Sequence, residues 1–331
     1  MARKQRRNKN KLSQFFVTLT IILLVLTGLY FLTSQKSFDV NSLIEEQITQ
    51  SLEKDKANET EAGQNETKQD AGKTKTETAD AVIASELTLN DIYIPACRAT
   101  TSHANGNDHE VHTYCGFTLC YRESYEVAEW VSYVLTKEET IHVTGRSNNF
   151  RKDPAISTGS ATLADYKKSG YDRGHLAPAA DMEWSKESVS DSFFMSNMTP
   201  QKPDFNRGIW GKLEHQVRDW AKEHGEVVVI TGPILEKPST GYASIGSNKV
   251  AVPEYFYKVL LAKDKNNKYQ AIGFILPNTG YDKSFMDFCV TVDEVERRSS
   301  LDFFELLDDE TENSIEGKFD LDFWNKGIKQ D

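Results

Sequence analysis

Short runs of apolar residues, many of them aromatic or β-branched, recur along the chain from residue 86 onward. Runs of this length and composition predict strands that are largely buried. The strands are expected over residues 114–121, 130–135, 226–235, 254–261 and 269–276. Because helix and strand patterns follow each other without a regular βαβ alternation, the chain is expected to adopt an α+β fold with a mixed, largely antiparallel sheet.

A helix pattern lies between the second and third of these strands. Apolar residues recur there every three or four positions, which predicts one buried stripe. They are Ile209, Leu213, Val217 and Trp220. The helix is expected to begin at Asp204 or Phe205 and to end at His224-Gly225. Asn206 then lies in the first turn, near the positive end of the helix dipole.

Two short strands are expected ahead of this helix. The first carries the histidine of Asp172-Arg173-Gly174-His175, and the second is expected over residues 193–198. Residues 146–170 have the composition of a loop. Further on, Thr291 and Glu294 have the spacing of a capping box that opens another helix.

The first 85 residues have a different character. Residues 1–14 are basic, and the 18 residues Phe15–Leu32 carry no charge, which just suffices for a helix to span a hydrocarbon layer of about 30 Å. We predict a cytoplasmic tail over residues 1–14 and a transmembrane anchor over residues 15–33, with a cleaved signal peptide as the alternative. Residues 34–85 are mostly polar and predict a disordered tether. The folded domain is expected over residues 86–331.

This order predicts a single-pass membrane protein whose folded domain lies outside the cytoplasm, in the periplasm or the extracellular space. If the apolar segment is cleaved, the domain is secreted. The net charge of the whole chain is −11, so overall charge gives no support for a nucleic-acid partner, and a phosphate-binding surface has to be a local patch. The cations considered for such a patch are Arg146, Arg151, Lys152, Arg173, Lys202 and Arg207.

The chain contains four cysteines, Cys97, Cys115, Cys120 and Cys289. They are compatible with disulfides in an exported domain, but the sequence does not fix their pairing. Cys115 and Cys120 are expected on one short strand, where their side chains point to opposite faces and do not bridge each other. His109, His112, Cys115 and Cys120 also suggest a zinc site. A zinc hydrolase that uses His109 and His112 is therefore a further interpretation, although the ligand spacing is loose and a structural strand explains the segment better.

The motif Asp172-Arg173-Gly174-His175 is followed, in order, by further blocks of residues. They are Ser196 to Gln201, Asn206 to Trp210, Leu213-Glu214, Ile230 to Pro233, Val252 to Lys258 and Val290 to Glu296. With these blocks, and with a leading hairpin from Tyr114 to Leu135, the chain resembles the DNA/RNA non-specific endonuclease family, which includes the endonuclease G type enzymes. The resemblance implies a ββα-metal catalytic finger within the α+β fold.

The resemblance also implies a role for each matched residue. His175 would be the general base, since an imidazole accepts a proton near neutral pH. Asn206 would be the direct ligand of Mg²⁺, which prefers oxygen atoms, and Mn²⁺ would also support activity. Glu214 would hold metal-bound water. Arg173 or Arg146 would contact a phosphate oxygen.

Four other residues complete the predicted site: Asp172, Asn197, Gln201 and Arg151. Asn197 and Gln201 would orient the loop and the ring of His175. The family arginine that contacts the scissile phosphate aligns with Asn148, so its identity in this chain stays open among Arg146, Arg151 and Arg173.

The resemblance therefore implies a Mg²⁺-dependent endonuclease that hydrolyses phosphodiester bonds of DNA and RNA with little sequence preference, because phosphate contacts carry no base identity. Its partners would be the nucleic-acid substrate and, through the amino-terminal helix, a membrane. The oligomeric state stays open, with a homodimer as one option. The alternative function is a non-catalytic, membrane-anchored nucleic-acid receptor on a decayed nuclease fold.

Overall fold

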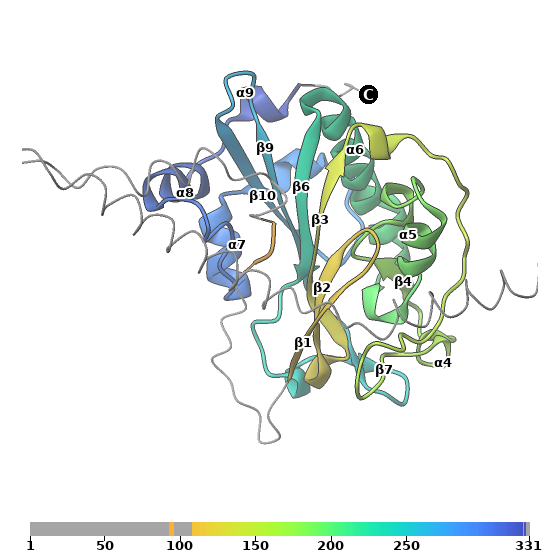
Figure 1. Cartoon of the computed structure of the whole chain (residues 1–331). Coiled ribbons are helices and arrows are strands. Elements are labelled where there is room, and N and C mark those ends of the chain that lie inside the picture. The colour runs from red at the N-terminus through yellow and green to blue at the C-terminus, as the bar shows by residue number, and fades with distance from the viewer. Residues whose placement is uncertain (1–92, 96–107, 327, 329–331) are drawn as a thin grey trace, which may run out of the picture. The chain divides into compact units, whose positions relative to one another are not determined.

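The computed structural model describes residues 93–95, 108–326 and 328. A seven-stranded sheet in the order β1-β2-β3-β6-β9-β10-β11 forms its centre, and all neighbouring strands in it are antiparallel (Figure 1). The strands are β1 (His109–Thr113), β2 (Thr118–Arg122), β3 (Val127–Thr136), β6 (Glu226–Pro233), β9 (Tyr255–Lys263), β10 (Tyr269–Pro277) and β11 (Cys289–Val290). The predicted α+β class with a largely antiparallel sheet is confirmed.

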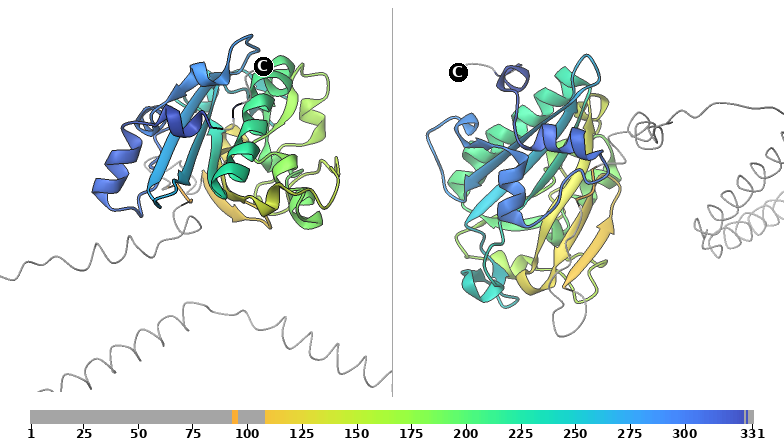
Figure 2. Two further views of the ribbon diagram at one scale, coloured as in Figure 1. Left: turned by 90° about the horizontal axis from the view of Figure 1, so that it is seen from above. Right: turned by 90° about the vertical axis from the view of Figure 1, so that its left-hand side faces the viewer.

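Helices cover both faces of this sheet (Figure 2). On one face lie α5 (Lys186–Asp191) and α6 (Gly211–His224), with α9 (Leu321–Trp324) packed against α6, and on the other lie α7 (Val292–Ser299) and α8 (Asp309–Glu316). Along β9, Phe256 and Leu260 belong to the core under α6, whereas Tyr257 and Val259 belong to the core under α7. Burial on both faces explains why the central strands are nearly continuous apolar runs.

A smaller unit on the α6 face carries the candidate site. It consists of β4 (Asp172–His175) and β5 (Met198–Gln201), which pair antiparallel, followed by a π-helical turn over Phe205–Trp210 and then by α6. Two strands and a helix therefore follow each other as predicted. Further short elements of the described chain are α4 (Leu163–Tyr166), the hairpin of β7 (Ser244–Ile245) and β8 (Val250–Ala251), and several 3₁₀ turns.

The predicted boundaries need two corrections. Residues 193–198 are not a strand, because Met195–Asn197 form a 3₁₀ turn and β5 begins only at Met198. The helix does not run regularly from Asp204 or Phe205, because Gly208 leaves the helical conformation (φ −102°, ψ −115°) and the regular helix begins at Gly211. Its predicted end is confirmed by Gly225, whose φ of 92° favours glycine.

The cysteine prediction is partly wrong. Cys115 lies in the turn that precedes β2, and only Cys120 lies on the strand. No disulfide joins any two of Cys115, Cys120 and Cys289, whereas Cys97 lies outside the described residues.

Within the part of the chain that the structure describes, no helix is long and apolar enough to cross a membrane. The predicted tail, anchor and tether (residues 1–14, 15–33 and 34–85) lie outside that part.

Candidate functional site

The pairing of β4 with β5 positions the Asp-Arg-Gly-His motif. Asp172 lies opposite Gln201, and His175 lies opposite Met198. A Cβ atom at Gly174 would lie 2.0 Å from Cδ of Gln201, so only glycine fits at this position of the motif. Gln201 is fully buried, and its amide atoms have no hydrogen-bond partner among the described residues. Gln201 therefore packs against the motif and makes no hydrogen bond to the ring of His175. Its predicted role in orienting that ring stays a prediction.

Asn197 holds the chain where it leaves β4. Its Oδ1 accepts a hydrogen bond from the backbone N–H of Ala177 at 2.9 Å, and its Nδ2 donates to the carbonyls of Ala177 and Ser192 at 3.0 and 2.8 Å. Its own carbonyl accepts from the N–H of Leu176 at 3.0 Å. Through these contacts Asn197 fixes the loop directly after His175.

The imidazole of His175 lies in an aromatic pocket that two arginines border. The ring centroids of Phe193 and Phe150 lie 5.1 and 5.8 Å from that of His175. Arg146 lies over Phe193 at 5.0 Å, and Arg173 lies over Phe150 at 4.0 Å. Cation–π contacts of this kind hold a guanidinium in place without consuming its hydrogen-bond donors. Arg146 also donates a hydrogen bond from Nε to Oδ1 of Asn148, at 2.9 Å.

The electrostatics of this pocket keep His175 neutral. Burial, followed by the positive charges of Arg146 and Arg173, lowers the pKa of the imidazole to about 3. Its Nε2 atom is buried and has no hydrogen-bond partner among the described residues. An unprotonated, unpartnered ring nitrogen beside two cations suits a base that acts on an anionic substrate.

Asn206 approaches the same motif from the π-helical turn. Its Nδ2 donates a hydrogen bond to Oδ2 of Asp172 at 3.1 Å. Arg207 binds both oxygens of Asp172, with Nε and Nη2 at 2.8 and 2.6 Å from them. Because these contacts hold the amide nitrogen of Asn206, its carbonyl Oδ1 is the atom that could bind a cation.

Glu214 lies half-buried on α6, near enough to the almost completely buried Lys258 for their charges to interact. Lys258 belongs to the face of β9 that packs against α6, and its Nζ lies 2.5 Å from Oγ1 of Thr231 and 5.0 Å from the ring centroid of Trp210. Burial raises the pKa of the Glu214 carboxyl, which the charge of Lys258 partly offsets, and burial lowers the pKa of Lys258 itself. The two groups therefore depend on each other for their charge states.

A buried ion pair lies near Glu214. Asp181 is buried and accepts hydrogen bonds from Arg218 at 2.7 Å and from the hydroxyl of Tyr133 at 2.6 Å. The charges of Asp181 and Arg218 act on Glu214 with opposite signs. No role for Lys258, Asp181 or Arg218 was predicted from the sequence. A lysine at an inward-facing position of an apolar strand was the available signal, because lysine is almost never buried without a partner.

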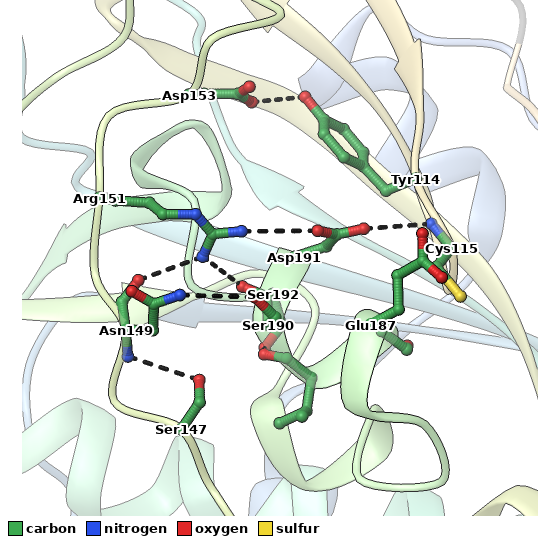
Figure 3. A network of polar contacts seen from close by, with 12 residues as sticks. Tyr114, Cys115, Ser147, Asn149, Arg151, Asp153, Glu187, Ser190, Asp191 and Ser192 are labelled. Atoms are coloured by element: carbon green, nitrogen blue, oxygen red, sulfur yellow. Dashed lines mark hydrogen bonds and ion pairs between the residues drawn. The ribbon is translucent and has the colours of Figure 1, made fainter. Parts of the chain in front are cut away.

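The guanidinium of Arg151 binds groups away from His175. Figure 3 shows its guanidinium between the 147–153 segment and the end of α5. Nη1 donates to the carbonyls of Asn149 and Ser190 at 3.2 and 2.6 Å, and Nη2 lies 3.5 Å from Oδ1 of Asp191. Arg151 therefore holds a loop against a helix, which leaves Arg146 and Arg173 as the arginines beside the imidazole.

The zinc interpretation of His109 and His112 also fails on geometry. The two residues are three apart on β1 and therefore point to opposite faces of the strand. His112 pairs with Glu110 at 3.2 Å, whereas His109 lies 2.7 Å from Glu129. They do not converge on one ion.

A family model and several known proteins that are similar to this chain all describe nucleases. Residues 98–310 match the family model described as DNA/RNA non-specific endonuclease. The chain is 36% identical over 213 residues to "Nuclease EXOG, mitochondrial" of Xenopus laevis, a match that covers 60% of this chain and 59% of that protein. It is 35% identical over 199 residues to "Endonuclease G, mitochondrial" of Homo sapiens, covering 56% of this chain and 67% of that protein.

One solved structure is similar over nearly its whole length. It is described as "Crystal structure of the EndoG/EndoGI complex: Mechanism of EndoG inhibition", and the match has a TM-score of 0.58 and 33% identity, covering 67% of this chain and 99% of that chain. The chain spans less of the first curated relatives, namely 59% of the Xenopus laevis protein and 62% of its Danio rerio counterpart.

These relatives correct the predicted localisation. Several are named mitochondrial nucleases, so a single-pass membrane protein with its domain outside the cytoplasm is not supported. The prediction rested on one uncharged run of 18 residues, Phe15–Leu32. A run of that length is at the lower limit for a spanning helix.

Proposed function

Because the chain belongs to the DNA/RNA non-specific endonuclease family, we propose that it is a metal-dependent endonuclease that hydrolyses phosphodiester bonds of DNA and RNA. The observation that carries the proposal is a neutral, buried imidazole between two arginines, on a strand whose first residue orients the amide of Asn206.

In this proposal His175 takes the proton from the attacking water. A phosphodiester is anionic, so its arrival between Arg146 and Arg173 offsets part of their charge and raises the pKa of the imidazole from its value of about 3 in the substrate-free protein. The base becomes stronger when the substrate is in place. The aromatic walls formed by Phe150 and Phe193 exclude bulk water from the ring.

Arg146 and Arg173 would bind the non-bridging oxygens of the phosphate. Both guanidinium groups are anchored by aromatic rings, and a planar guanidinium is suited to contact two oxygens of one phosphate. Neither contact reads a base, which agrees with cleavage that has little sequence preference.

The donor set around Asn206 fits a hard divalent cation, and we propose Mg²⁺, with Mn²⁺ as a substitute. Oδ1 of Asn206 would be the direct protein ligand, because Asp172 holds the amide nitrogen. Glu214 would accept hydrogen bonds from water molecules on the ion. When bound, such an ion supplies positive charge to the phosphate and to the leaving oxygen.

Lys258 and the Asp181–Arg218 pair would set the charge of Glu214. A carboxyl group has its full capacity to accept hydrogen bonds from water only when it is ionised. Burial alone would favour the neutral acid, and the ammonium of Lys258 opposes that effect. The buried lysine is therefore proposed as a positioning residue that favours the ionised form of Glu214 near neutral pH.

The test is cleavage of supercoiled plasmid and of a single-stranded RNA by the full chain with Mg²⁺, beside His175→Ala and Asn206→Ala. Both variants should lose at least about a hundredfold in rate, with circular dichroism spectra like that of the parent chain. Undiminished cutting by a folded variant would refute the role given to that residue. Salt-dependent binding without cutting by the parent chain would refute the enzymatic function.

A further inference from the structure

The sheet face opposite the candidate active site carries a group of acidic side chains. Asp293 and Glu296 lie about one turn apart on α7, and Glu316 is the last residue of α8. Each offers one carboxylate oxygen, and these oxygens lie within 4.8 Å of one another. Figures 1 and 2 show α7 and α8 side by side on this face, away from α6.

Glu316 makes the group unusual. The residue is only 6% exposed, and its Oε1 is buried without a hydrogen-bond partner among the described residues. Leaving a buried carboxylate oxygen without a partner costs free energy, so an unpaired atom of this kind needs an explanation. Burial, followed by the negative charges of Glu296, Glu312, Asp293 and Asp302, raises the pKa of Glu316 to about 9.

The other two side chains lie beside Glu316. Glu296 accepts a hydrogen bond from the backbone N–H of Phe303 at 2.8 Å through Oε1. Asp293 lies close to the end of α8, since a Cβ atom at Gly317 would lie 3.5 Å from Oδ2 of Asp293. Carboxylates that repel each other are thus kept together by the packing of two helices.

We propose that Asp293, Glu296 and Glu316 form a binding site for a calcium-type divalent cation. Calcium takes six to eight oxygen ligands at about 2.3–2.6 Å, so oxygens around one ion lie at most about 5 Å apart. The three carboxylates meet this condition, and water would complete the shell. Three protein carboxylates favour Ca²⁺ over Mg²⁺, which keeps several waters and usually takes one or two.

The ion would join α7 to the end of α8. Val295 of α7 and Ile315 of α8 belong to one apolar core with β9 and β10, so the site would fasten this core at its outer surface. It lies on the other face of the sheet from His175 and Asn206. Its role would therefore be structural, and independent of the metal proposed for cleavage.

Calcium binding by the full chain tests the proposal without relying on activity. The chain should carry the Asn206→Ala substitution, which removes the proposed ligand of the catalytic metal, and should first be freed of metal with EDTA. Calorimetric titration with CaCl₂ should show one site per chain. The Tm should rise by about 5 °C or more when calcium exceeds the Kd a hundredfold.

Two substitutions and one matched control locate the site. Glu316→Gln and Asp293→Asn should each abolish the rise in Tm, whereas Glu310→Gln, at an exposed acid of the same helix, should retain it. The proposal is overturned if calcium produces neither heat nor a change in Tm in the Asn206→Ala chain, or if Glu316→Gln responds as that chain does. It is also overturned if Glu316→Gln raises the Tm in EDTA while calcium has no effect, because Glu316 is then simply protonated.

Discussion

Asp172 accepts a hydrogen bond from the side-chain amide of Asn206, with 3.1 Å between Oδ2 and Nδ2. The bond links the first residue of β4 to the helical turn that follows β5. It determines which half of the amide is engaged, and it leaves the carbonyl oxygen of Asn206 for a cation. In the proposed site Asp172 is therefore a positioning residue that acts through Asn206.

Replacing Asp172 should weaken metal binding more than it slows cleavage at saturating metal. In Asp172→Ala the amide of Asn206 is able to rotate, so the Mg²⁺ concentration that gives half-maximal cleavage should rise about 10- to 100-fold. Plasmid cleavage measured over a range of Mg²⁺ concentrations gives this value directly.

Two further variants separate the hydrogen bond from the neighbouring ion pair. Arg207→Gln removes the exposed ion pair with Asp172 but keeps the bond to Asn206, and it should change the half-maximal Mg²⁺ concentration less than about threefold. Asp172→Asn keeps an acceptor oxygen and should retain most of the affinity. Equal losses in Arg207→Gln and Asp172→Ala would contradict the positioning role.

The three arginines near the motif should separate into two classes. Arg146→Ala and Arg173→Ala should each lower kcat/KM by about 10- to 100-fold, because each removes a charged contact to phosphate. Arg151→Ala serves as the matched control, since its guanidinium binds Asn149, Ser190 and Asp191. It should lower Tm while leaving kcat/KM of the folded protein within about threefold. If fully folded Arg151→Ala shows a large loss of kcat/KM, the assignment of phosphate binding to Arg146 and Arg173 is wrong.

The sequence predicted well what local patterns determine. The apolar runs that became β6, β9 and β10 were long and rich in β-branched or aromatic residues, and Gly225 marked the end of α6 because a positive φ favours glycine. The turn at Met195–Asn197 was missed, since it depends on the side chain of Asn197 reaching the carbonyls of Ala177 and Ser192. That contact is not visible in the spacing of apolar residues.

Contacts between segments that are distant in the sequence could not be predicted from local patterns. Lys258 meets Glu214 only because β9 packs beneath α6, and nothing in either segment records that the two are neighbours. Arg151 and Arg146 both lie in a segment with the composition of a loop, so its path over the surface decides which of them reaches His175. Local propensity does not determine such a path.

Removing the charge of Lys258 should shift the pH profile of cleavage. In Lys258→Met no ammonium charge opposes the effect of burial on Glu214, so the pKa of its carboxyl should rise. The acid limb of the kcat profile should therefore move to higher pH by about one unit. Lys263→Met, at the outer end of the same strand, is the control and should leave the profile in place. A fall in Tm with an unshifted profile would mean that Lys258 is only structural.

The buried imidazole also makes a definite prediction about stability and pH. His175 has a pKa of about 3 in the folded chain, whereas an unfolded histidine titrates near 6.5. Between these values the unfolded state binds more protons, so the free energy of unfolding should fall as the pH drops below about 6.5. By pH 5 the loss due to this one residue should amount to about 2 kcal/mol relative to pH 8. Glutamine does not titrate, so His175→Gln lacks this loss, and the stability of the parent chain relative to the variant should decline by that amount over the same range. Urea unfolding of both chains at several pH values measures the difference, and two parallel curves would mean that the imidazole is not held neutral in the folded protein.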